Sequence, residues 1–391
     1  MRIGIDCRTI LNPGSGEGAG VGHYTHYLVN ELLAQDRKNT YVLFFDSRLR
    51  DIEVFARPNV VLRRFPFSSY RRFLPFTYSH MLVAAALLKE RLDVFHNPAN
   101  VLPLTYRRPS VITVHDLAIY KNPSWFPGQV FSRHLLVPQS VKKAKAIIAV
   151  SESTKRDLRE LFSTPTKKIH VVLEGVDVRP INVKDRGVDA QQKFHLRKRY
   201  VLFMGTLEAR KNLVRLVQAF GRLLETSGKA LDDVTLVLAG NRGWKSEEVF
   251  NQIKELKLER RVKWIGYVTQ NEKLALMRGA TAFVYPSVYE GFGLPVLEAL
   301  ALGVPVVTSE VSSLPEVAGP AARYVNPEEI NDIREGLSDV LFNERLRTKL
   351  HEAGPKQAKH FSWQRCASET LAVYQGVAQN SGRRNHKAKK R

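Results

Sequence analysis

The stretch VYPSVYEGFGLPVLEALALGVPVV, residues 284–307, decides how this chain folds. It reads as the end of a buried strand, a loop with glycines, a helix, and the start of another buried strand. Pro295 stands in the first turn of the predicted helix, where the N–H that proline lacks costs nothing. Two carboxylates, Glu290 and Glu298, flank this loop, although a strand that leads into a helix requires neither. The stretch therefore predicts an α/β unit whose loop carries a binding site.

The same alternation of short apolar runs with helical or loop segments extends along the whole chain. The runs lie at residues 2–10, 41–45, 59–65, 92–98, 110–116, 146–152 and 168–177, and again at 199–207, 234–240, 262–268, 281–287, 304–310 and 322–327. Such alternation is typical of a parallel sheet with helices on both faces. We therefore expect an α/β protein with two Rossmann-like domains that face each other across a cleft. In such sheets, ligands bind at the carboxyl ends of the strands.

The 391 residues are too many for a typical single core, which also favours two domains. We expect an N-terminal domain over 1–178, a linker over 179–198, and a C-terminal domain over 199–360. The linker is predicted because this segment is polar and shows no consistent period. A last helix is expected over 361–380. The segment 381–391 is basic and contains no acidic residue, which predicts a disordered tail.

The composition is that of an ordinary globular protein, with 44% hydrophobic and 25% charged residues. Cys7 and Cys366 lie near opposite ends of the chain without metal-ligand spacing, which favours a reducing compartment over a disulfide framework. Asp6 interrupts the place where the apolar core of a secretory signal would run. No uncharged apolar run approaches the length of a membrane span. We expect a cytoplasmic protein, either soluble or peripheral on the inner face of the cell membrane.

The net charge of +22 indicates anionic partners: nucleic acid, an acidic membrane surface or a phosphorylated substrate. Part of this charge is local. The segment 63–76 mixes arginines with aromatic residues, and the tail 381–391 is rich in lysine and arginine. Both segments are compatible with contact to an anionic membrane and equally with a solvated, solubilising surface.

The loop between the two glutamates has the features of an anion site. It lies at the carboxyl end of a predicted strand and at the amino end of a helix, where free N–H groups and the helix dipole favour negative charge. Its glycines allow a phosphate to approach the backbone. Glu298 lies about one turn into the helix and could reach the hydroxyls of a ribose, whereas Glu290 could reach a sugar beyond the phosphates. The alternative is a helix start with incidental acids.

A second segment, GTLEARKNL at 205–213, follows the first strand of the second half. Arg210 and Lys211 stand at the start of the next helix, where the helix dipole disfavours cations. Cations at this place are explained if an anion lies between them and the backbone. A diphosphate is such an anion, and arginine can bind it with two hydrogen bonds. The alternative is a solvated basic turn.

Two further features lie in the first half. His115, in TVHDL at 113–117, stands at a strand end and could contact a substrate hydroxyl or stabilise developing charge, although a histidine there is often structural. The glycine loop 16–24 permits close approach of a ligand to the backbone. Its match to the dinucleotide-binding fingerprint through Gly14, Gly16 and Ala19 is weak.

These residues resemble the family 4 retaining glycosyltransferases (group 1) of GT-B fold, and mannosyltransferases in particular. The resemblance is carried by GVGHYTHYL, VHDL, VSESTKRDL, GTLEARKNL, AGNRGW, EGFGLPVLEALALGVPVV, SSLPEVAG and FSWQRCASETLAVY, and so covers nearly the whole chain. It implies transfer of a hexose from a nucleotide diphosphate sugar with retention of anomeric configuration. It also implies that the first domain binds the acceptor and that the last helix crosses back to pack on it.

The resemblance assigns catalytic roles to His115, Glu290, Arg210 and Lys211. Arg210 and Lys211 would bind the diphosphate, Glu290 the sugar and phosphate, and His115 the transferred sugar. Leu294 would lie against the nucleotide. The complete set of residues implied in donor binding is Gly20, Gly22, Gly205, Arg210, Lys211, Glu290, Gly291, Phe292, Gly293, Leu294 and Glu298. The tail beyond residue 380 has no counterpart in the family pattern.

No metal and no cofactor beyond the nucleotide sugar is expected. The sequence shows no Asp-x-Asp pair at a strand end, and a cationic clamp would stabilise the leaving diphosphate instead. The resemblance implies front-face attack in which the departing phosphate takes the acceptor proton, so neither glutamate need be a nucleophile. It favours GDP-mannose as donor, with UDP-glucose and related sugars as the alternative. The expected acceptor is a glycan or a lipid-linked oligosaccharide of polysaccharide or O-antigen assembly.

Other classes of protein fit the sequence less well. A NAD-dependent oxidoreductase would also use Rossmann-like halves, but it would not need the Arg210–Lys211 pair or the loop between the two glutamates. A nucleic-acid-binding protein would explain the charge but would leave the two-domain cleft without a purpose, so no specific nucleic acid partner is expected. A phosphorylase-like activity shares the fold, yet nothing in the sequence marks a pyridoxal phosphate lysine.

Overall fold

The computed structural model describes residues 1–11, 20–47, 49, 51–65, 78–126, 132–177 and 190–388. The chain forms two compact units. The N-terminal unit comprises Met1–Lys121, Pro127–Gly175 and Ser362–Arg391, and the C-terminal unit comprises Asn122–Phe126 and Val176–Phe361. The chain thus changes unit after Gly175 and after Phe361, where the sequence predicts domain ends at 178 and 360. Residues 179–189 of the predicted linker lie outside the described residues.

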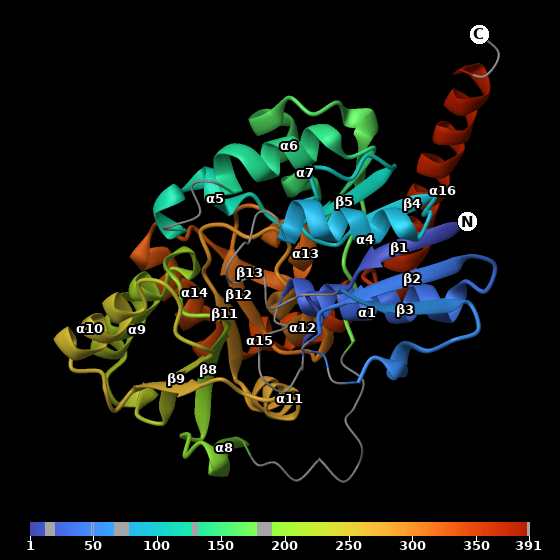
Figure 1. Cartoon of the computed structure of the whole chain (residues 1–391). Helices are drawn as coiled ribbons and strands as arrows, with labels where there is room; N and C mark the ends of the chain where they lie inside the picture. Colours follow the sequence, from blue (N-terminus) through green and yellow to red (C-terminus); the bar gives the residue numbers. More distant parts are fainter. Residues whose placement is uncertain are drawn as a thin grey trace. The chain divides into compact units, whose positions relative to one another are not determined.

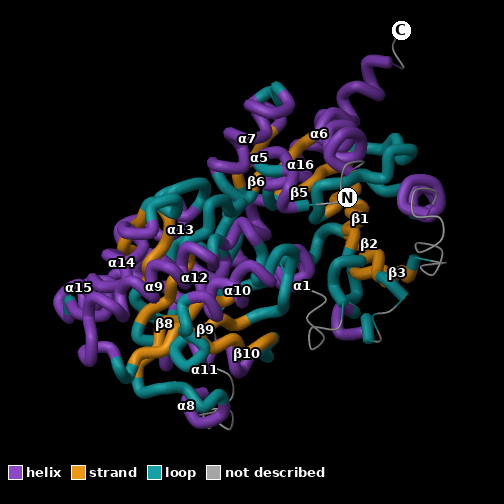
Figure 2. The backbone as a smooth tube through the Cα atoms, turned by 90° about the vertical axis from the view of Figure 1, so that its left-hand side faces the viewer, coloured by secondary structure: helices purple, strands orange, loops and turns teal. Residues whose placement is uncertain are grey.

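The N-terminal unit is built on a 7-stranded parallel sheet with the order β3-β2-β1-β4-β5-β6-β7 (Figures 1 and 2). Its strands are β1 (Arg2–Asp6), β2 (Thr40–Phe45), β3 (Val60–Arg64), β4 (Val94–Asn97), β5 (Ser110–Val114), β6 (Ala146–Ala149) and β7 (Ile169–Val171). The first strand lies inside the sheet, and the chain builds outward from it in both directions. This is the strand order of the Rossmann fold, in which the crossover point lies between the first and fourth strands.

Helices and short turns of helix connect these strands. The helices are α1 (Val21–Gln35), α4 (Val83–Lys89), α5 (Ala118–Lys121), α6 (Val137–Lys143), α7 (Glu152–Phe162) and α16 (Trp363–Ala388). The shorter helical turns are η2 (Glu53–Phe55), η3 (Tyr78–Leu82), η5 (Ser132–Leu136) and η6 (Thr166–Lys168). Ser151 precedes α7 as its N-cap residue, and its side chain accepts a hydrogen bond from Thr154 N–H.

The C-terminal unit repeats the same plan. Its 6-stranded parallel sheet has the order β10-β9-β8-β11-β12-β13. The strands are β8 (Arg199–Met204), β9 (Val234–Ala239), β10 (Val262–Gly266), β11 (Ala282–Tyr285), β12 (Val306–Ser309) and β13 (Ala322–Val325). The helices are α8 (Ala190–Lys193), α9 (Leu213–Ser227), α10 (Glu247–Glu255), α11 (Gln270–Gly279), α12 (Leu294–Ala301), α13 (Leu314–Ala318), α14 (Ile330–Phe342) and α15 (Glu344–Ala358), with the shorter turns η4 (Pro123–Trp125), η8 (Ala209–Lys211), η9 (Gly228–Leu231) and η10 (Gly319–Ala321). The prediction of an α/β fold with two Rossmann-like domains is confirmed.

The core of the N-terminal unit lies on both faces of its sheet. Along β2, Tyr41, Leu43 and Phe45 belong to one buried apolar cluster. Val42 and Phe44, which point to the opposite face, belong to the other. Successive side chains of a strand alternate between faces, so a strand covered on both sides needs a continuous apolar run. This requirement explains why the strands could be recognised from runs such as YVLFF.

The helix α16 belongs to the N-terminal unit and packs against α1. At its start the ring of Trp363 stacks on Tyr27, with 5.3 Å between the ring centroids. A Cβ atom on Gly175 would lie 2.2 Å from Trp363 N, so the chain segments that leave and re-enter this unit pass each other closely. The bounds of α16 reach Ala388, and the disordered tail expected from residue 381 stays a prediction.

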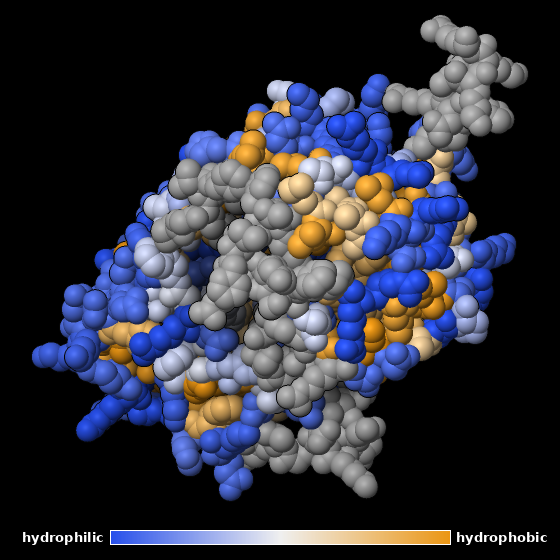
Figure 3. Space-filling model, viewed as in Figure 1, coloured by the Kyte–Doolittle hydropathy of each residue, from blue (hydrophilic) through white to orange (hydrophobic). Residues whose placement is uncertain are grey.

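The surface shown in Figure 3 is largely hydrophilic, with hydrophobic residues in separate patches. Across the described ranges, none of the helices has both the length and the apolar character needed to cross a bilayer.

Candidate functional site

Two loops meet at the carboxyl ends of the central strands in the C-terminal unit. Strands β8 and β11 are neighbours in the sheet, and the crossover point of its strand order lies between them. The loop after β8 contains Gly205 and leads to Arg210 and Lys211, and the loop after β11 contains 290–293. A backbone hydrogen bond from Val288 N–H to Arg210 O, 2.9 Å long, joins the loops. This is the place where an open α/β sheet binds its ligand.

A buried cluster of charges occupies this place. Glu290 accepts from Arg210 Nη1 at 2.9 Å through Oε2, and from Lys211 Nζ at 2.5 Å through Oε1. Arg210 also pairs with Glu208, at 2.8 Å. The side chains of Lys211, Glu290 and Arg210 are only 7%, 8% and 15% exposed. The structure thus brings together three of the residues to which the family resemblance assigns catalytic roles. We call Arg210, Lys211 and Glu290 the charge cluster.

Local structure fixes the position of the cations. Asn212 follows them in the left-handed backbone region, with φ of 62°, a conformation that asparagine adopts more readily than most residues. Its side-chain Nδ2 donates to the carbonyls of Pro286 and Pro327, at 3.1 and 2.6 Å. Lys211 Nζ also donates to Tyr285 Oη, 2.6 Å away, at the end of β11. These bonds hold the turn that carries both cations against the carboxyl ends of β11 and β13.

The electrostatics of the cluster are dominated by burial and pairing. Burial alone would raise the pKa of Glu290, but the charges of Arg210 and Lys211 outweigh it and lower that pKa to about 2. Burial lowers the pKa of Lys211, and the charge of Glu290 opposes this shift. From the sequence, a diphosphate is expected as the anion beside the two cations. In this structure Glu290 pairs with both cations, which leaves one net positive charge in the cluster, and the diphosphate stays a prediction.

The loop after β11 is fixed from the opposite side by two serines. Ser312 Oγ accepts from Glu290 N–H at 3.0 Å, and Ser313 Oγ donates to the carbonyls of Glu290 and Phe292 at 3.0 and 2.8 Å. Gly293 precedes α12 with φ of 108°, and a Cβ atom there would lie 2.9 Å from Leu314 Cδ2, so only glycine fits without strain. The two serines belong to the motif SSLPEVAG, which the sequence alone marks without giving either serine a role.

The remaining predicted donor-binding residues of this unit lie around the same loop. Gly291 and Phe292 are buried, and Leu294 is the first residue of α12, which has no side-chain cap. A helix start of this kind leaves backbone N–H groups that can face an anion. Glu298, within α12, accepts from Lys273 Nζ at 2.5 Å through Oε1. The partner Lys273, from α11, belongs to none of the motifs identified in the sequence.

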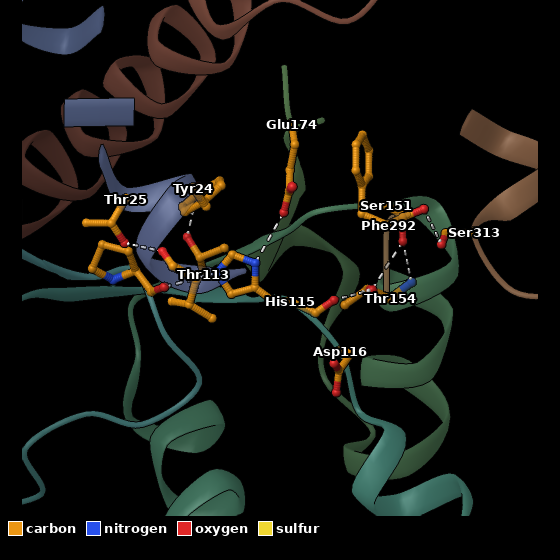
Figure 4. A network of polar contacts seen from close by, with 12 residues as sticks. Tyr24, Thr25, Thr113, His115, Asp116, Ser151, Thr154, Glu174, Phe292 and Ser313 are labelled. Carbon is orange, nitrogen blue, oxygen red and sulfur yellow. Dashed lines mark hydrogen bonds and ion pairs between the residues drawn. The ribbon is translucent and has the colours of Figure 1, made fainter. Parts of the chain in front are cut away.

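His115 belongs to the N-terminal unit and follows the carboxyl end of β5 (Figure 4). Its Nδ1 lies 3.2 Å from Glu174 Oε1, and its Nε2 lies 3.0 Å from the carbonyl oxygen of Pro98. Figure 4 shows His115 and Glu174 pointing toward each other. The Glu174 side chain is only 4% exposed. Both ring nitrogens of His115 therefore face acceptors of its own unit, and Glu174 is a partner that sequence reasoning missed.

A buried hydrogen-bonded network extends behind His115. His96 Nδ1 lies 2.6 Å from Tyr374 Oη of α16, and its Nε2 lies 2.9 Å from Thr113 Oγ1. Thr113 Oγ1 is also 3.2 Å from Tyr24 Oη, and the Tyr24 ring contacts His115 edge-on, with 4.7 Å between centroids. Burial lowers the pKa of His96 to about 3, so this ring is neutral. The network ties α16 to the strands that carry His115.

Gly20 and Gly22 lie at the start of α1 in the same unit. Gly20 is the N-cap residue, and a Cβ atom on Gly22 would lie 2.3 Å from the carbonyl oxygen of Thr9. Close packing of the helix therefore requires glycine at 22. The fingerprint residues Gly14, Gly16 and Ala19 lie outside the described residues. Within the described ranges, the structure contains no group of three or more His, Cys, Asp or Glu side chains arranged to hold a metal ion.

Comparisons with known proteins agree on one family. Residues 18–179 match the family model described as Glycosyltransferase Family 4, and residues 186–357 match the model described as Glycosyl transferases group 1. The O-antigen chain mannosyltransferase B of Escherichia coli is 34% identical over 72% of this chain and 74% of its own length. The O-antigen chain mannosyltransferase RfbU of Salmonella typhimurium is 27% identical over 73% of this chain and 76% of its own length.

Solved structures show the same fold. WaaG, a glycosyltransferase involved in lipopolysaccharide biosynthesis, superposes with a TM-score of 0.73 over 96% of this chain and 100% of its own, at 15% identity. The sucrose-phosphate synthase of Thermosynechococcus elongatus superposes with a TM-score of 0.76 over 96% of this chain and 98% of its own, at 19% identity.

Proposed function

The chain belongs to the family 4, group 1 glycosyltransferases, and from this premise we propose that it transfers mannose from GDP-mannose with retention of configuration. The proposed acceptor is a glycan or lipid-linked oligosaccharide in the assembly of O-antigen or a related polysaccharide. Two mannosyltransferases of O-antigen chains among its relatives support this choice of sugar and pathway. The alternative is a UDP-sugar donor, as for a glucosyltransferase.

The charge cluster is the observation that carries the proposal. When a nucleoside diphosphate leaves, negative charge develops on its outer phosphate. Arg210 and Lys211 are held at the carboxyl ends of β8 and β11, beside the uncapped start of α12, where they can stabilise that charge as it develops. Two fixed cations would supply the positive charge that a metal supplies in other transferases, so we propose that the reaction needs no metal.

Glu290 has a different role in this proposal. Its carboxylate is bound by both cations and its pKa is held at about 2, so it stays ionised and oriented throughout the physiological range. A carboxylate held in this way is a poor nucleophile but a good acceptor for hydroxyls of the transferred sugar. We propose that Glu290 positions the sugar and that the acceptor attacks from the front face, with the departing phosphate taking its proton. Glu298 would bind the ribose, and the contact of His115 with the sugar stays a prediction.

The place of action proposed is the inner face of the cell membrane, because a lipid-linked acceptor would be found there. The basic segment 63–76 gives this location little support, since residues 66–77 lie outside the described residues and Arg63 pairs with Glu90 at 2.5 Å.

Thermal stabilisation by GDP, UDP, ADP and dTDP, each with and without EDTA, tests the donor. We expect GDP alone to raise the unfolding temperature, equally with EDTA. Lys211→Ala should weaken this response, whereas Lys254→Ala, at an exposed position of the same unit, should not. Proton NMR of the product made from GDP-mannose should show the α anomer of the donor retained. Selective stabilisation by UDP would mean that the donor is a UDP-sugar and not GDP-mannose. Loss of the stabilisation in EDTA would overturn the metal-free mechanism.

A further inference from the structure

Tyr285 ends strand β11 at the carboxyl edge of the sheet, in contact with the charge cluster. Its side chain is buried, with only 1% of the residue exposed. The ring stacks on Phe203 of β8 and on Phe283 of β11, with 5.6 and 5.9 Å between the ring centroids. Its backbone carbonyl accepts from Thr308 Oγ1 of β12 at 3.0 Å. Neighbouring strands therefore hold the ring, and its hydroxyl group has a fixed place at this edge.

The hydroxyl group of Tyr285 is one of two groups that hold the ammonium group of Lys211. Lys211 Nζ donates to Tyr285 Oη at 2.6 Å and to Glu290 Oε1 at 2.5 Å, and these are its two hydrogen-bond acceptors in the described part of the chain. An ammonium group has three N–H donors. Two fixed acceptors therefore leave one N–H for a ligand, and they determine the direction in which it points.

The two acceptors differ in charge. Burial, and after it the charge of Glu290, raises the pKa of Tyr285, so this side chain is a neutral phenol. Its oxygen satisfies a buried N–H of Lys211 without cancelling positive charge, as a second carboxylate in its place would do. Burial already lowers the pKa of Lys211, and an N–H left without an acceptor there would destabilise the charged form further. A neutral acceptor therefore keeps this lysine both charged and in place.

We propose that Tyr285 is a positioning residue for Lys211: its hydroxyl group holds the ammonium so that the third N–H points to the leaving diphosphate. This role rests on the transfer reaction proposed above, but the effect of Tyr285 on Lys211 itself does not depend on the donor. The other charged groups that act on Lys211 are Glu290, Arg210 and Glu208. All three stay when Tyr285 alone loses its hydroxyl group, so Tyr285→Phe isolates the proposed role.

The kinetics of sugar transfer by Tyr285→Phe test the proposal. Phenylalanine keeps the stacked ring and removes only one hydrogen bond to a charged group, so kcat should fall about 10- to 100-fold with little change in the KM for the donor. The pKa of Lys211 should also fall, because that bond favours the charged form, and the alkaline limb of the pH profile of kcat should move to lower pH.

The matched control is Tyr200→Phe, at the amino end of β8 in the same sheet. Tyr200 is also buried, and its hydroxyl group donates to the carbonyl of Leu276 at 2.7 Å. This variant loses a buried hydrogen bond far along the strand from the charge cluster. It should unfold at a lower temperature than the wild type but keep the wild-type kcat and pH profile.

Two further measurements show whether Tyr285 acts through Lys211. In a Lys211→Ala background, Tyr285→Phe should lower kcat no further, because residues that act as a unit are not additive. NMR of the protein with isotope-labelled lysine, without any donor, measures the pKa of Lys211 directly, and Lys211→Arg identifies the signal. This pKa should be lower in Tyr285→Phe than in the wild type.

A wild-type kcat and pH profile in Tyr285→Phe would overturn the proposal. An equal loss of kcat in the Lys211→Ala background, or an unchanged pKa of Lys211, would do the same, since the hydroxyl group would then serve only the fold. The unfolding temperature of each variant shows whether it has folded. If the wild type transfers no sugar, the proposed activity fails, and the titration of Lys211 still decides whether Tyr285 holds this lysine.

Discussion

The two units share a strand order but differ in what stands at the carboxyl edge of their sheets. In the C-terminal unit this edge carries Arg210, Lys211 and Glu290, three charged groups buried together. In the N-terminal unit it carries His115, with Glu174 hydrogen-bonded to its ring and with hydroxyl groups and the neutral imidazole of His96 behind it (Figure 4). The fold fixes where chemistry occurs, and the side chains at that edge decide which chemistry it is.

The difference also concerns stability. Burying an ion pair costs desolvation that its attraction barely offsets, and well-packed apolar residues often serve the fold as well. The charge cluster is therefore better explained by its chemistry than by stability. The network behind His115 differs because its groups are neutral. Their hydrogen bonds connect α16 to the sheet without the desolvation cost of buried charges. Variants of the two edges should accordingly fail in different ways.

The largest effect is expected from Lys211→Ala. Loss of one group that stabilises developing charge costs about 3 kcal/mol, or a 10²- to 10³-fold lower kcat. The loss of kcat is measured from the steady-state rate of sugar transfer at saturating donor. Lys254→Ala, an exposed cation of the same unit, is the control and should keep full activity. If Lys211→Ala keeps its kcat and loses only affinity for the donor, the lysine binds the donor in the ground state and does not stabilise the charge that develops on the leaving diphosphate.

A second prediction uses pH to isolate Glu290. Because its folded-state pKa of about 2 lies below the ordinary value of 4.5, this carboxylate stabilises the native state above pH 4.5 and ceases to do so as pH falls toward 2. The contribution at neutral pH is about 3 kcal/mol. Glu290→Gln should therefore unfold at a lower temperature than wild type at pH 7. The difference between the two unfolding temperatures should become smaller between pH 5 and pH 2.

The exposed Glu259→Gln is the control for this measurement and should follow the wild type at every pH. A constant gap between Glu290→Gln and the wild type down to pH 2 would contradict the paired, ionised state of Glu290. Thermal unfolding followed by circular dichroism at fixed ionic strength is sufficient, because only differences between unfolding midpoints are compared.

The strands were predictable because their signal is local. A strand covered on both faces must be apolar throughout, as YVLFF at 41–45 is, and a run of this kind stands out between polar loops. The positions of Arg210, Lys211 and Glu290 were predictable for a related reason, because residues at the ends of adjacent parallel strands meet at one edge.

Side-chain partners were beyond reach of the sequence. Glu174 lies 59 positions from His115, and Lys273 lies 25 positions from Glu298, so neither pair shows in a motif or a period. The sequence predicts a diphosphate beside Arg210 but gives no sign of the ion pair with Glu290, because dipole arguments identify the sign of a missing charge but not its source.

The smallest effect is expected at the N-terminal edge, from Glu174→Gln. Glutamine keeps the volume and an acceptor oxygen but loses the charge that strengthens the bond to His115 Nδ1. If Glu174 positions His115 for the transferred sugar, kcat should fall about fivefold with an unchanged KM for the donor. Glu53→Gln, at an exposed position of the same unit, is the control. A purely structural role would lower the unfolding temperature and leave the kcat of the folded enzyme intact, so this split decides whether the N-terminal edge takes part in transfer or only supports the fold.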